Sequence, residues 1–317
     1  MGFIDNIKEK AKKVNKNIGF TEKDPRILKA IDVISREKIA TPIFIGDKTE
    51  FLDTGKSLGL DLNNIRVLEP DDKYAKEFFD IRKGKISFED AKDLSMQPNY
   101  YGTLALNEGL IDGLVSGALY ATSETFRPAI HVIGTKDGIK TASTYFILIG
   151  NKEYIFADCA LNIDPNEEQL ADIAISTNDS AIEHGFNPKL AMLSFSTKGS
   201  ASHEMVRKVS GATEIVKKKR PDVKVEGELQ VDAAMIPKVA MHKAKDSEIQ
   251  GDANIFIFPD LNSGNIGYKL VERFSDYKAI GPISQGFKKP VNDLSRGCSI
   301  EDIINVTAIT VLQGDEK

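Results

Sequence analysis

The chain has 317 residues, about twice the length of a common domain, so we expect two domains. Its composition, 41% hydrophobic and 28% charged, is ordinary for a globular protein and supplies enough apolar residues for sizeable cores. The formal net charge of −5 argues against a nucleic-acid-binding protein, and any anionic substrate must then be bound by locally concentrated arginines.

Cysteine usage and the opening of the chain indicate the cellular compartment. The only two cysteines, Cys159 and Cys298, are far apart and offer neither a disulfide framework nor a metal-ligand spacing. Residues 1–6 lack the charged-then-apolar order of a signal peptide. No apolar run reaches the roughly 18 residues that a membrane span needs. These features predict a cytoplasmic protein that has no membrane partner and binds no metal.

Short apolar runs alternate with longer amphipathic stretches along the chain. The runs typical of strands are Pro42–Ile45, Ile65–Leu68, Gly113–Ser116, Ser143–Ile149, Tyr154–Ala157, Leu190–Phe195 and Asn254–Phe258. Helical spacing of apolar residues occurs in Glu167–His184, Ala201–Lys219 and Ile266–Phe274. Strands and helices that alternate in this way favour α/β layers with largely parallel sheets.

The division between the two domains has no Pro/Ser/Gly-rich hinge to mark it. The polar turn Gly150–Glu153 separates two apolar strands and is typical of a hairpin near the boundary. We therefore expect two αβα-layered domains with a cleft between them. The first comprises residues 1–148 together with a returning C-terminal segment, about 299–317. The second comprises residues 149–298.

The stretch most informative about chemistry is Gly281–Ser299. Its glycines, prolines and small polar residues predict tight, ordered loops. From Ile300 onward apolar residues recur at helical spacing, so Ser299 is a candidate N-cap. Free N–H groups and the positive end of the helix dipole favour an anion there. Arg296 precedes the helix by about one turn, where its guanidinium can grip two phosphate oxygens.

The same residues also have purely structural interpretations. Ser299-Ile300-Glu301-Asp302 fits a capping box with Asp in place of Glu, so Asp302 can serve only to cap its own helix. Arg296 can equally be an ordinary surface arginine. Spacing alone leaves both alternatives open.

Four longer motifs resemble the phosphate acetyltransferase family: Ser194–Ala201, Glu226–Ala234, Phe256–Lys269 and Asn292–Ser299. The last of these resembles the signature near the family's C-terminus. The resemblance extends along nearly the whole chain and thins before about Tyr100. Motifs of this length are highly specific.

This resemblance implies that Asp302, Ser295 and Arg296 are catalytic and that Arg82 and Arg127 bind coenzyme A. It further implies transfer of an acetyl group between coenzyme A and phosphate, by direct attack in a ternary complex with Asp302 as base. Coenzyme A and acetyl-CoA are then substrates, no cofactor is tightly bound, and the protein is a homodimer joined through its second domain.

Both cofactor arginines have structural alternatives as well. Arg82 and the residues after it read as a basic helix C-terminus that ends in glycine. Arg127 precedes Pro128, which biases it toward an extended backbone. Without the resemblance, either arginine would be interpreted as structural.

The chain departs from the family pattern at two positions before Arg127. Glu124 stands where the family usually has Asp, and Tyr120 where it often has His. Acyl-chain preference is therefore open, and a phosphate butyryl- or propionyltransferase is the first alternative. A non-catalytic acetyl-CoA-sensing module is the second, although the chain retains Ser295, Arg296 and Asp302 together.

Overall fold

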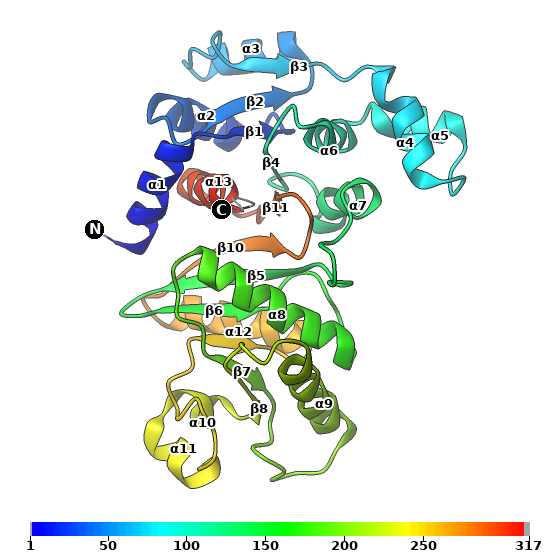
Figure 1. The fold of residues 1–317 in the computed structure, drawn as a ribbon. Helices are drawn as coiled ribbons and strands as arrows, with labels where there is room; N and C mark the ends of the chain where they lie inside the picture. The colour runs from blue at the N-terminus through cyan, green and yellow to red at the C-terminus, as the bar shows by residue number, and fades with distance from the viewer. Residues whose placement is uncertain (1, 314–317) are drawn as a thin grey trace. The chain divides into compact units, whose positions relative to one another are not determined.

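The computed structural model describes residues 2–313, which fold as two α/β units (Figure 1). The first unit runs from the N-terminus to Thr135 and resumes at Phe287. The second unit is Lys136–Gly286. Each unit contains one sheet, and the C-terminal helix belongs to the first. Within residues 2–313, no helix is both long and apolar enough to cross a membrane.

These boundaries differ from those expected at 148/149 and 298/299. The strand β5 (Ser143–Ile149) lies wholly in the second unit, because it pairs there with β6 (Glu153–Ala157) and β10 (Lys278–Gln285). The strand β11 (Val291–Asp293) lies in the first unit, because it pairs with β4 (Gly113–Ser116). The hairpin turn therefore lies within the second unit, and the chain passes between the units at Thr135–Lys136 and Gly286–Phe287.

The sheet of the first unit has the strand order β11-β4-β1-β2-β3, and all its neighbours are parallel. Its remaining strands are β1 (Asn17–Phe20), β2 (Thr41–Ile45) and β3 (Arg66–Leu68). In the central strand β1, Ile18 and Phe20 point to one face and are fully buried, and Gly19 on the other face lies against the side chains of Ile45, Ile111 and Leu114. A strand buried on both faces is what a parallel sheet covered by two helical layers requires.

Helices cover both faces of this first sheet. On one side, α1 (Phe3–Val14) and α2 (Pro25–Arg36) pack on α13 (Ile300–Leu312). On the other lie α6 (Pro98–Glu108) and α7 (Thr122–Val132), which pack on each other (Figure 1). The smaller elements are α3 (Lys48–Ser57), η1 (Asp72–Tyr74), α4 (Ala75–Arg82) and α5 (Phe88–Ser95).

The second sheet is mixed, with the order β10-β5-β6-β9-β7-β8. Its β10, β5 and β6 are antiparallel, while β6, β9 (Ile255–Ile257), β7 (Leu190–Leu193) and β8 (Val225–Leu229) are parallel. The helices α8 (Glu167–Glu183) and α9 (Glu204–Lys219) pack together on one side, and α12 (Leu261–Phe274) packs on β10, β5 and β6. Two short helices, α10 (Val231–Met235) and α11 (Pro237–Lys243), follow β8.

The predicted α/β class with largely parallel sheets is confirmed, and each predicted strand occurs within two residues of its expected bounds. Two predictions of elements were wrong. Gly281–Gly286 was expected to be loop, yet β10 runs to Gln285. Pro282 is tolerated there because β10 is an edge strand with an irregular register between Ile280 and Ile283. The helix α12 begins at Leu261 rather than Ile266, because Asp260 caps a first turn of weak helix formers.

Candidate active site

The segment Leu294–Ser299 connects β11 to α13, and Asp302 lies in the first turn of that helix. Apolar residues of α13, among them Ile303, Val306 and Ala308, are buried and fix the helix on the first sheet. Ser299 is its N-cap, as predicted, and the Asp302 main-chain N–H donates to the Ser299 Oγ (3.1 Å). Asp302 Oδ2 in turn accepts from the main-chain N–H and the hydroxyl of Ser299, both at 2.8 Å. The capping box is therefore present.

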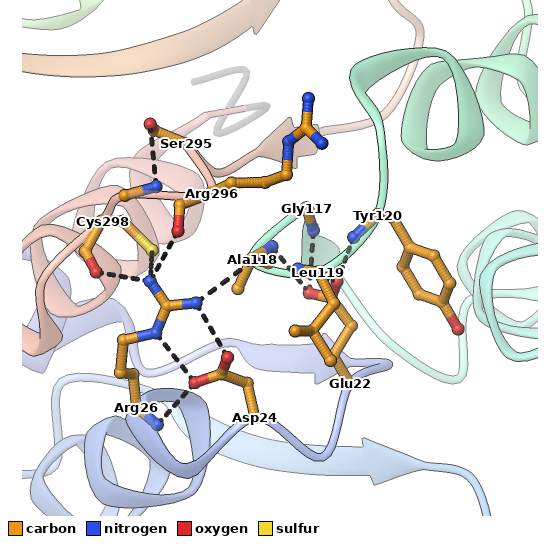
Figure 2. A network of polar contacts seen from close by, with 11 residues as sticks. Glu22, Asp24, Arg26, Gly117, Ala118, Leu119, Tyr120, Ser295, Arg296 and Cys298 are labelled. Carbon is orange, nitrogen blue, oxygen red and sulfur yellow. Dashed lines mark hydrogen bonds and ion pairs between the residues drawn. The ribbon is translucent and has the colours of Figure 1, made fainter.

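Ser295 and Arg296 are exposed on the loop that leads to this helix. The Ser295 hydroxyl oxygen accepts a long hydrogen bond of 3.3 Å from the N–H of Gly297. The Arg296 guanidinium forms no ion pair with any residue from 2 to 313, and its side chain extends away from Arg26 (Figure 2). A free guanidinium beside a helix N-terminus is suited to an anionic ligand.

Arg26 holds the backbone of this loop (Figure 2). Its Nη1 donates to the carbonyl oxygens of Arg296 and Cys298, both at 2.9 Å. Its Nη2 donates to the Ala118 carbonyl oxygen (3.2 Å) and to Asp24 Oδ2 (2.8 Å), and its Nε donates to Asp24 Oδ1 (2.9 Å). Since a guanidinium has five N–H donors, all of them are used within the protein. Arg26 thus fixes the loop and has no donor left for a ligand.

Asp24 orients Arg26. It is the N-cap of α2, where its side chain accepts from the main-chain N–H of Arg26, and Pro25 occupies the first helical position. The hydrogen bonds from the Arg26 side chain are the main cause that lowers the pKa of Asp24. A bidentate pair of this kind sets both the position and the plane of the guanidinium.

Glu22 organises the loop that follows β4. Only 2% of this residue is exposed, and its carboxylate accepts four consecutive main-chain N–H groups. Oε2 bonds to Gly117 (2.8 Å) and Ala118 (3.0 Å), and Oε1 to Leu119 (2.7 Å) and Tyr120 (3.0 Å). The Ala118 carbonyl oxygen of the same loop accepts a hydrogen bond from Arg26. The loop Gly117–Tyr120 is therefore held by two side chains, Glu22 and Arg26 (Figure 2).

Asp293 connects β11 to α7. It is 1% exposed, and its Oδ2 accepts a hydrogen bond of 2.7 Å from the Thr122 hydroxyl at the start of α7. Its Oδ1 is buried, has no hydrogen-bond partner among the described residues, and faces Gly117, where a Cβ atom would come within 2.0 Å of it. Burial, opposed by the Thr122 bond and reinforced by Glu22, raises the pKa of Asp293 to about 7.

Arg127 lies inside α7, not in an extended segment as its neighbour Pro128 had suggested. A proline in a helix leaves the carbonyl four residues earlier without its usual N–H partner. Here that carbonyl belongs to Glu124, and it accepts from the Asn99 side-chain amide at 3.3 Å. The replacement bond allows the helix to continue. The Glu124 carboxylate caps the same helix by accepting from the Ala121 N–H (2.8 Å).

Arg82 is the last residue of α4, as its structural interpretation predicted, and Lys83 after it adopts a left-handed conformation. Both arginines nevertheless lie near the same two groups. Burial raises the pKa of the Tyr100 hydroxyl and lowers that of the His131 imidazole, and the charges of Arg82 and Arg127 favour a lower pKa in both. Arg127 and Tyr100 also line a cavity of about 130 Å³ with Tyr120 and Glu124. The two arginines predicted to bind coenzyme A thus lie around one polar cluster.

A model of the family described as Phosphate acetyl/butaryl transferase matches residues 2–311. The chain belongs to this family. It is 46% identical over 296 residues to the phosphate acetyltransferase of Bacillus subtilis, with 92% of each chain covered. It is 47% identical over 328 residues to that of Thermoanaerobacterium thermosaccharolyticum, with 99% of each covered. A crystal structure of a phosphotransacetylase from Streptococcus pyogenes matches with a TM-score of 0.94 and 43% identity, covering 98% of this chain and 97% of that one.

Membership in the phosphate acetyl/butaryl transferase family confirms the predicted family and makes the chain an acyltransferase. The match begins at residue 2, so it covers the region before Tyr100 where the visible resemblance thins. The structure also corresponds to those of phosphotransacetylases over nearly its full length.

Sequence reasoning missed several residues of this candidate site. Glu22, Asp24 and Arg26 follow β1, a short strand that was not predicted. Asp24-Pro25 is a helix-start signal that could have drawn attention to Arg26. Cys298, predicted to be a packing residue, is buried, and desolvation raises the pKa of its thiol to about 11.

Proposed function

We propose that the chain is a phosphate acetyltransferase that moves an acetyl group between coenzyme A and inorganic phosphate by direct attack in a ternary complex, with Asp302 as base. The observation that carries the proposal is the Arg296 guanidinium near the N-terminus of α13, which has no ion-pair partner in the described part of the chain and stands on a loop that Arg26 fixes through two carbonyl oxygens. Such a loop is preorganised for a phosphoryl group, so binding requires little rearrangement.

In this mechanism the coenzyme A thiol attacks the carbonyl carbon of acetyl phosphate. The S–H proton passes to Asp302, the new C–S bond forms, and the bond between the carbonyl carbon and the phosphate oxygen breaks. Arg296 donates two parallel hydrogen bonds to phosphoryl oxygens and stabilises the negative charge that develops on the leaving phosphate. Ser295 donates a hydrogen bond to the oxyanion, and loss of one such donor typically costs about 3 kcal/mol.

The capping bonds of Asp302 are compatible with its role as base. Both bonds from Ser299 go to Oδ2, which leaves Oδ1 without a hydrogen bond from residues 2–313. One oxygen can cap the helix while the other accepts the thiol proton. An ordinary aspartate and an ordinary thiol differ by about 4.6 pKa units, or about 6 kcal/mol, so the site must narrow that difference. Cations near the thiol favour the thiolate and thereby reduce part of this pKa difference.

Arg82 and Arg127 bind anionic groups of coenzyme A away from the reacting carbonyl. Neither forms an ion pair within the described residues, and the Nε of Arg82 is buried without a hydrogen-bond partner. Uncompensated cations that lie around one cluster favour a phosphate-bearing ligand. The acyl group transferred is acetyl. Because the chain departs from the family pattern at Tyr120 and Glu124, propionyl and butyryl groups are the alternatives that a substrate series must compare.

The protein acts as a homodimer in the cytoplasm. On α12 of the second unit, Ile266 (55% exposed), Leu270 (50%) and Phe274 (84%) lie four residues apart and form one exposed apolar stripe. A second copy of the chain would cover this stripe. Light scattering should give twice the monomer mass for the wild type and a monomer for Phe274→Glu. Both cysteines are unpaired thiols, which suits a reducing compartment.

The proposed reaction is tested by measuring release of free thiol from acetyl-CoA on addition of phosphate. We expect phosphate-dependent release and a higher kcat/KM for acetyl-CoA than for propionyl- or butyryl-CoA. Faster turnover of butyryl-CoA would reassign the substrate. Binding of acetyl-CoA without any phosphate-dependent release would instead identify a sensing module.

A further inference from the structure

His131 belongs to a polar cluster built by three helices of the first unit. It lies on α7 one turn after Arg127, so the two side chains occupy the same face of that helix. The helix α6 contributes Tyr100, whose hydroxyl oxygen is 3.1 Å from His131 Nδ1. The helix α4 contributes Arg82 at its C-terminal end.

The charges around His131 are mostly positive. Burial lowers the pKa of His131, and Arg82, Arg127 and Lys85 lower it further. Further titratable groups of this region are the hydroxyls of Tyr100 and Tyr120 and the carboxylate of Glu124, all of which line the cavity beside Arg127. The Glu124 carboxylate also caps α7. Neither Arg82 nor Arg127 has a carboxylate partner within the described part of the chain. Both the burial and the surrounding positive charges therefore favour the neutral imidazole while the site is empty.

Tyr100 can support His131 in either protonation state. A hydroxyl both donates and accepts, so it can donate to a neutral Nδ1 or accept from a protonated one. His131 Nε2 forms no hydrogen bond with a described residue and stays available to a ligand. The same side chain can therefore gain a proton without losing its Tyr100 partner.

We propose that His131, beside Arg82 and Arg127, is a further residue that binds a phosphate group of coenzyme A and takes up a proton as it does so. The inference rests on the proposed function, because it requires coenzyme A to bind at these arginines. A phosphate group brings negative charge that offsets the surrounding cations, and this makes the imidazolium favourable. The imidazolium then forms a charge-assisted hydrogen bond with a phosphate oxygen.

Calorimetric titration of the whole protein with coenzyme A tests the proposal. Titrations at pH 6.5 in two buffers of different ionisation heat count the protons taken up on binding. We expect His131→Gln to take up fewer protons than the wild type and to bind coenzyme A about tenfold more weakly. At pH 8.5, where protonation of the histidine is less favourable, the two affinities should converge to within about twofold.

Two further variants make the test specific. His242→Gln removes an exposed histidine of the second unit and should match the wild type in affinity and proton count. Tyr100→Phe removes the hydroxyl that accepts from the imidazolium, so it should also reduce proton uptake, and it serves if His131→Gln does not fold.

The result that overturns the inference is unchanged proton uptake and unchanged affinity at pH 6.5 in folded His131→Gln. Failure of the proposed function has a different signature. In that case wild-type protein would bind no coenzyme A and release no thiol from acetyl-CoA. If Arg82→Gln weakens coenzyme A binding and His131→Gln does not, the proposed function stands and this inference fails.

Discussion

Nη1 of Arg26 donates a hydrogen bond of 2.9 Å to the main-chain carbonyl oxygen of Arg296. Arg26 thereby fixes the backbone at Arg296, while the Arg296 guanidinium itself forms no ion pair with residues 2–313 (Figure 2). Although the protein has a net charge of −5, this loop exposes a guanidinium. The five N–H donors of Arg26 are satisfied by protein atoms, and in the proposed mechanism the exposed Arg296 binds the phosphate.

Replacement of Arg26 should reduce turnover without weakening coenzyme A binding. Arg26→Gln leaves the carbonyls of Arg296 and Cys298 without their donor and leaves Asp24 unpaired, so we expect a loss of about 2–4 kcal/mol in the free energy of unfolding. Because the loop then loses its fixed geometry, kcat should fall by about 10–100-fold. The KM for coenzyme A should stay within about twofold of the wild-type value. Steady-state kinetics at saturating acetyl phosphate will measure both constants.

Arg36→Gln is the matched control for Arg26. It lies on the same helix and pairs only with Asp32, with 69% of its side chain exposed, so neither stability nor rate should change measurably. An Arg26 variant that loses stability but keeps its full kcat would contradict the positioning role.

Arg296→Lys should be nearly inactive while remaining folded. Lysine keeps the charge but loses the two-pronged match to phosphate oxygens, so we expect kcat to fall by at least about 100-fold. The fold should be unaffected, because the Arg296 side chain forms no ion pair with residues 2–313. Circular dichroism and thermal melting check this. Near-normal turnover with an intact spectrum would reject the phosphate-binding role.

Arg82→Gln and Arg127→Gln should act on the KM for coenzyme A. Each removes a charge-assisted contact to the cofactor's anionic groups, which corresponds to a rise of about 10–100-fold in that KM. The KM for acetyl phosphate should move little. Arg66→Gln, at an exposed position of β3, is the control. A large loss of kcat at saturating coenzyme A, with its KM unchanged, would show that these arginines take part in the chemistry.

Asp293 should make the stability of the protein depend on pH. The native state holds a proton on this carboxyl up to about pH 7, because burial raises its pKa, whereas an unfolded aspartate releases the proton near pH 4. The native state therefore binds more protons between these values. The free energy of unfolding should fall as pH rises from about 4 to about 7, by up to about 4 kcal/mol, and then level off.

Urea unfolding of wild type and Asp293→Asn from pH 4 to pH 8 measures this contribution as a difference. The variant cannot ionise at this position, so its stability relative to the wild type should increase across the window. Asp53→Asn, at an exposed position of α3, should give a constant difference. A constant difference for Asp293→Asn as well would show that this carboxyl is ionised throughout.

The sequence predicts those parts of the fold that depend on local pattern. Strands such as Gly113–Ser116 and Ser143–Ile149 are built around short apolar runs, and their bounds are visible from composition alone. The strand β1 was missed because its four residues include Gly19 and Asn17, which have low strand propensity; it forms because it pairs with β2 and β4 on either side. Pairing across the chain is invisible to a local pattern.

The site follows the same rule. Ser299 as N-cap could be predicted, since capping depends on residues three apart. The contacts of Arg26 with Arg296, 270 residues away, and of Glu22 with the N–H groups of Gly117–Tyr120 could not. The helical position of Arg127 was also hidden, because it depends on the Asn99 amide that replaces the bond lost at Pro128.

The remaining prediction separates the two roles of Asp302, and the capping box supplies its control. Asp302→Asn keeps an oxygen that can accept from Ser299 but removes the basic carboxylate. If Asp302 is the base, kcat should fall by on the order of 10²–10⁴ while the melting temperature hardly changes. Ser299→Ala does the converse, because it removes the cap hydroxyl and leaves the carboxylate. It should cost about 1 kcal/mol of stability, with little effect on kcat.

The pH dependence of the Asp302→Asn variant completes this comparison. Part of its lost rate should return as pH approaches the thiol's pKa of about 8.5, because coenzyme A then ionises without a base. Rates measured from pH 6.5 to 9 against the wild type will show this recovery. A deficit that stays constant over that range, or a variant that is fully active near neutral pH, would reject Asp302 as base. The carboxylate would then serve only to cap α13, and Arg296 and Ser295 would have to lower the barrier without a base, by stabilising the leaving phosphate and the oxyanion.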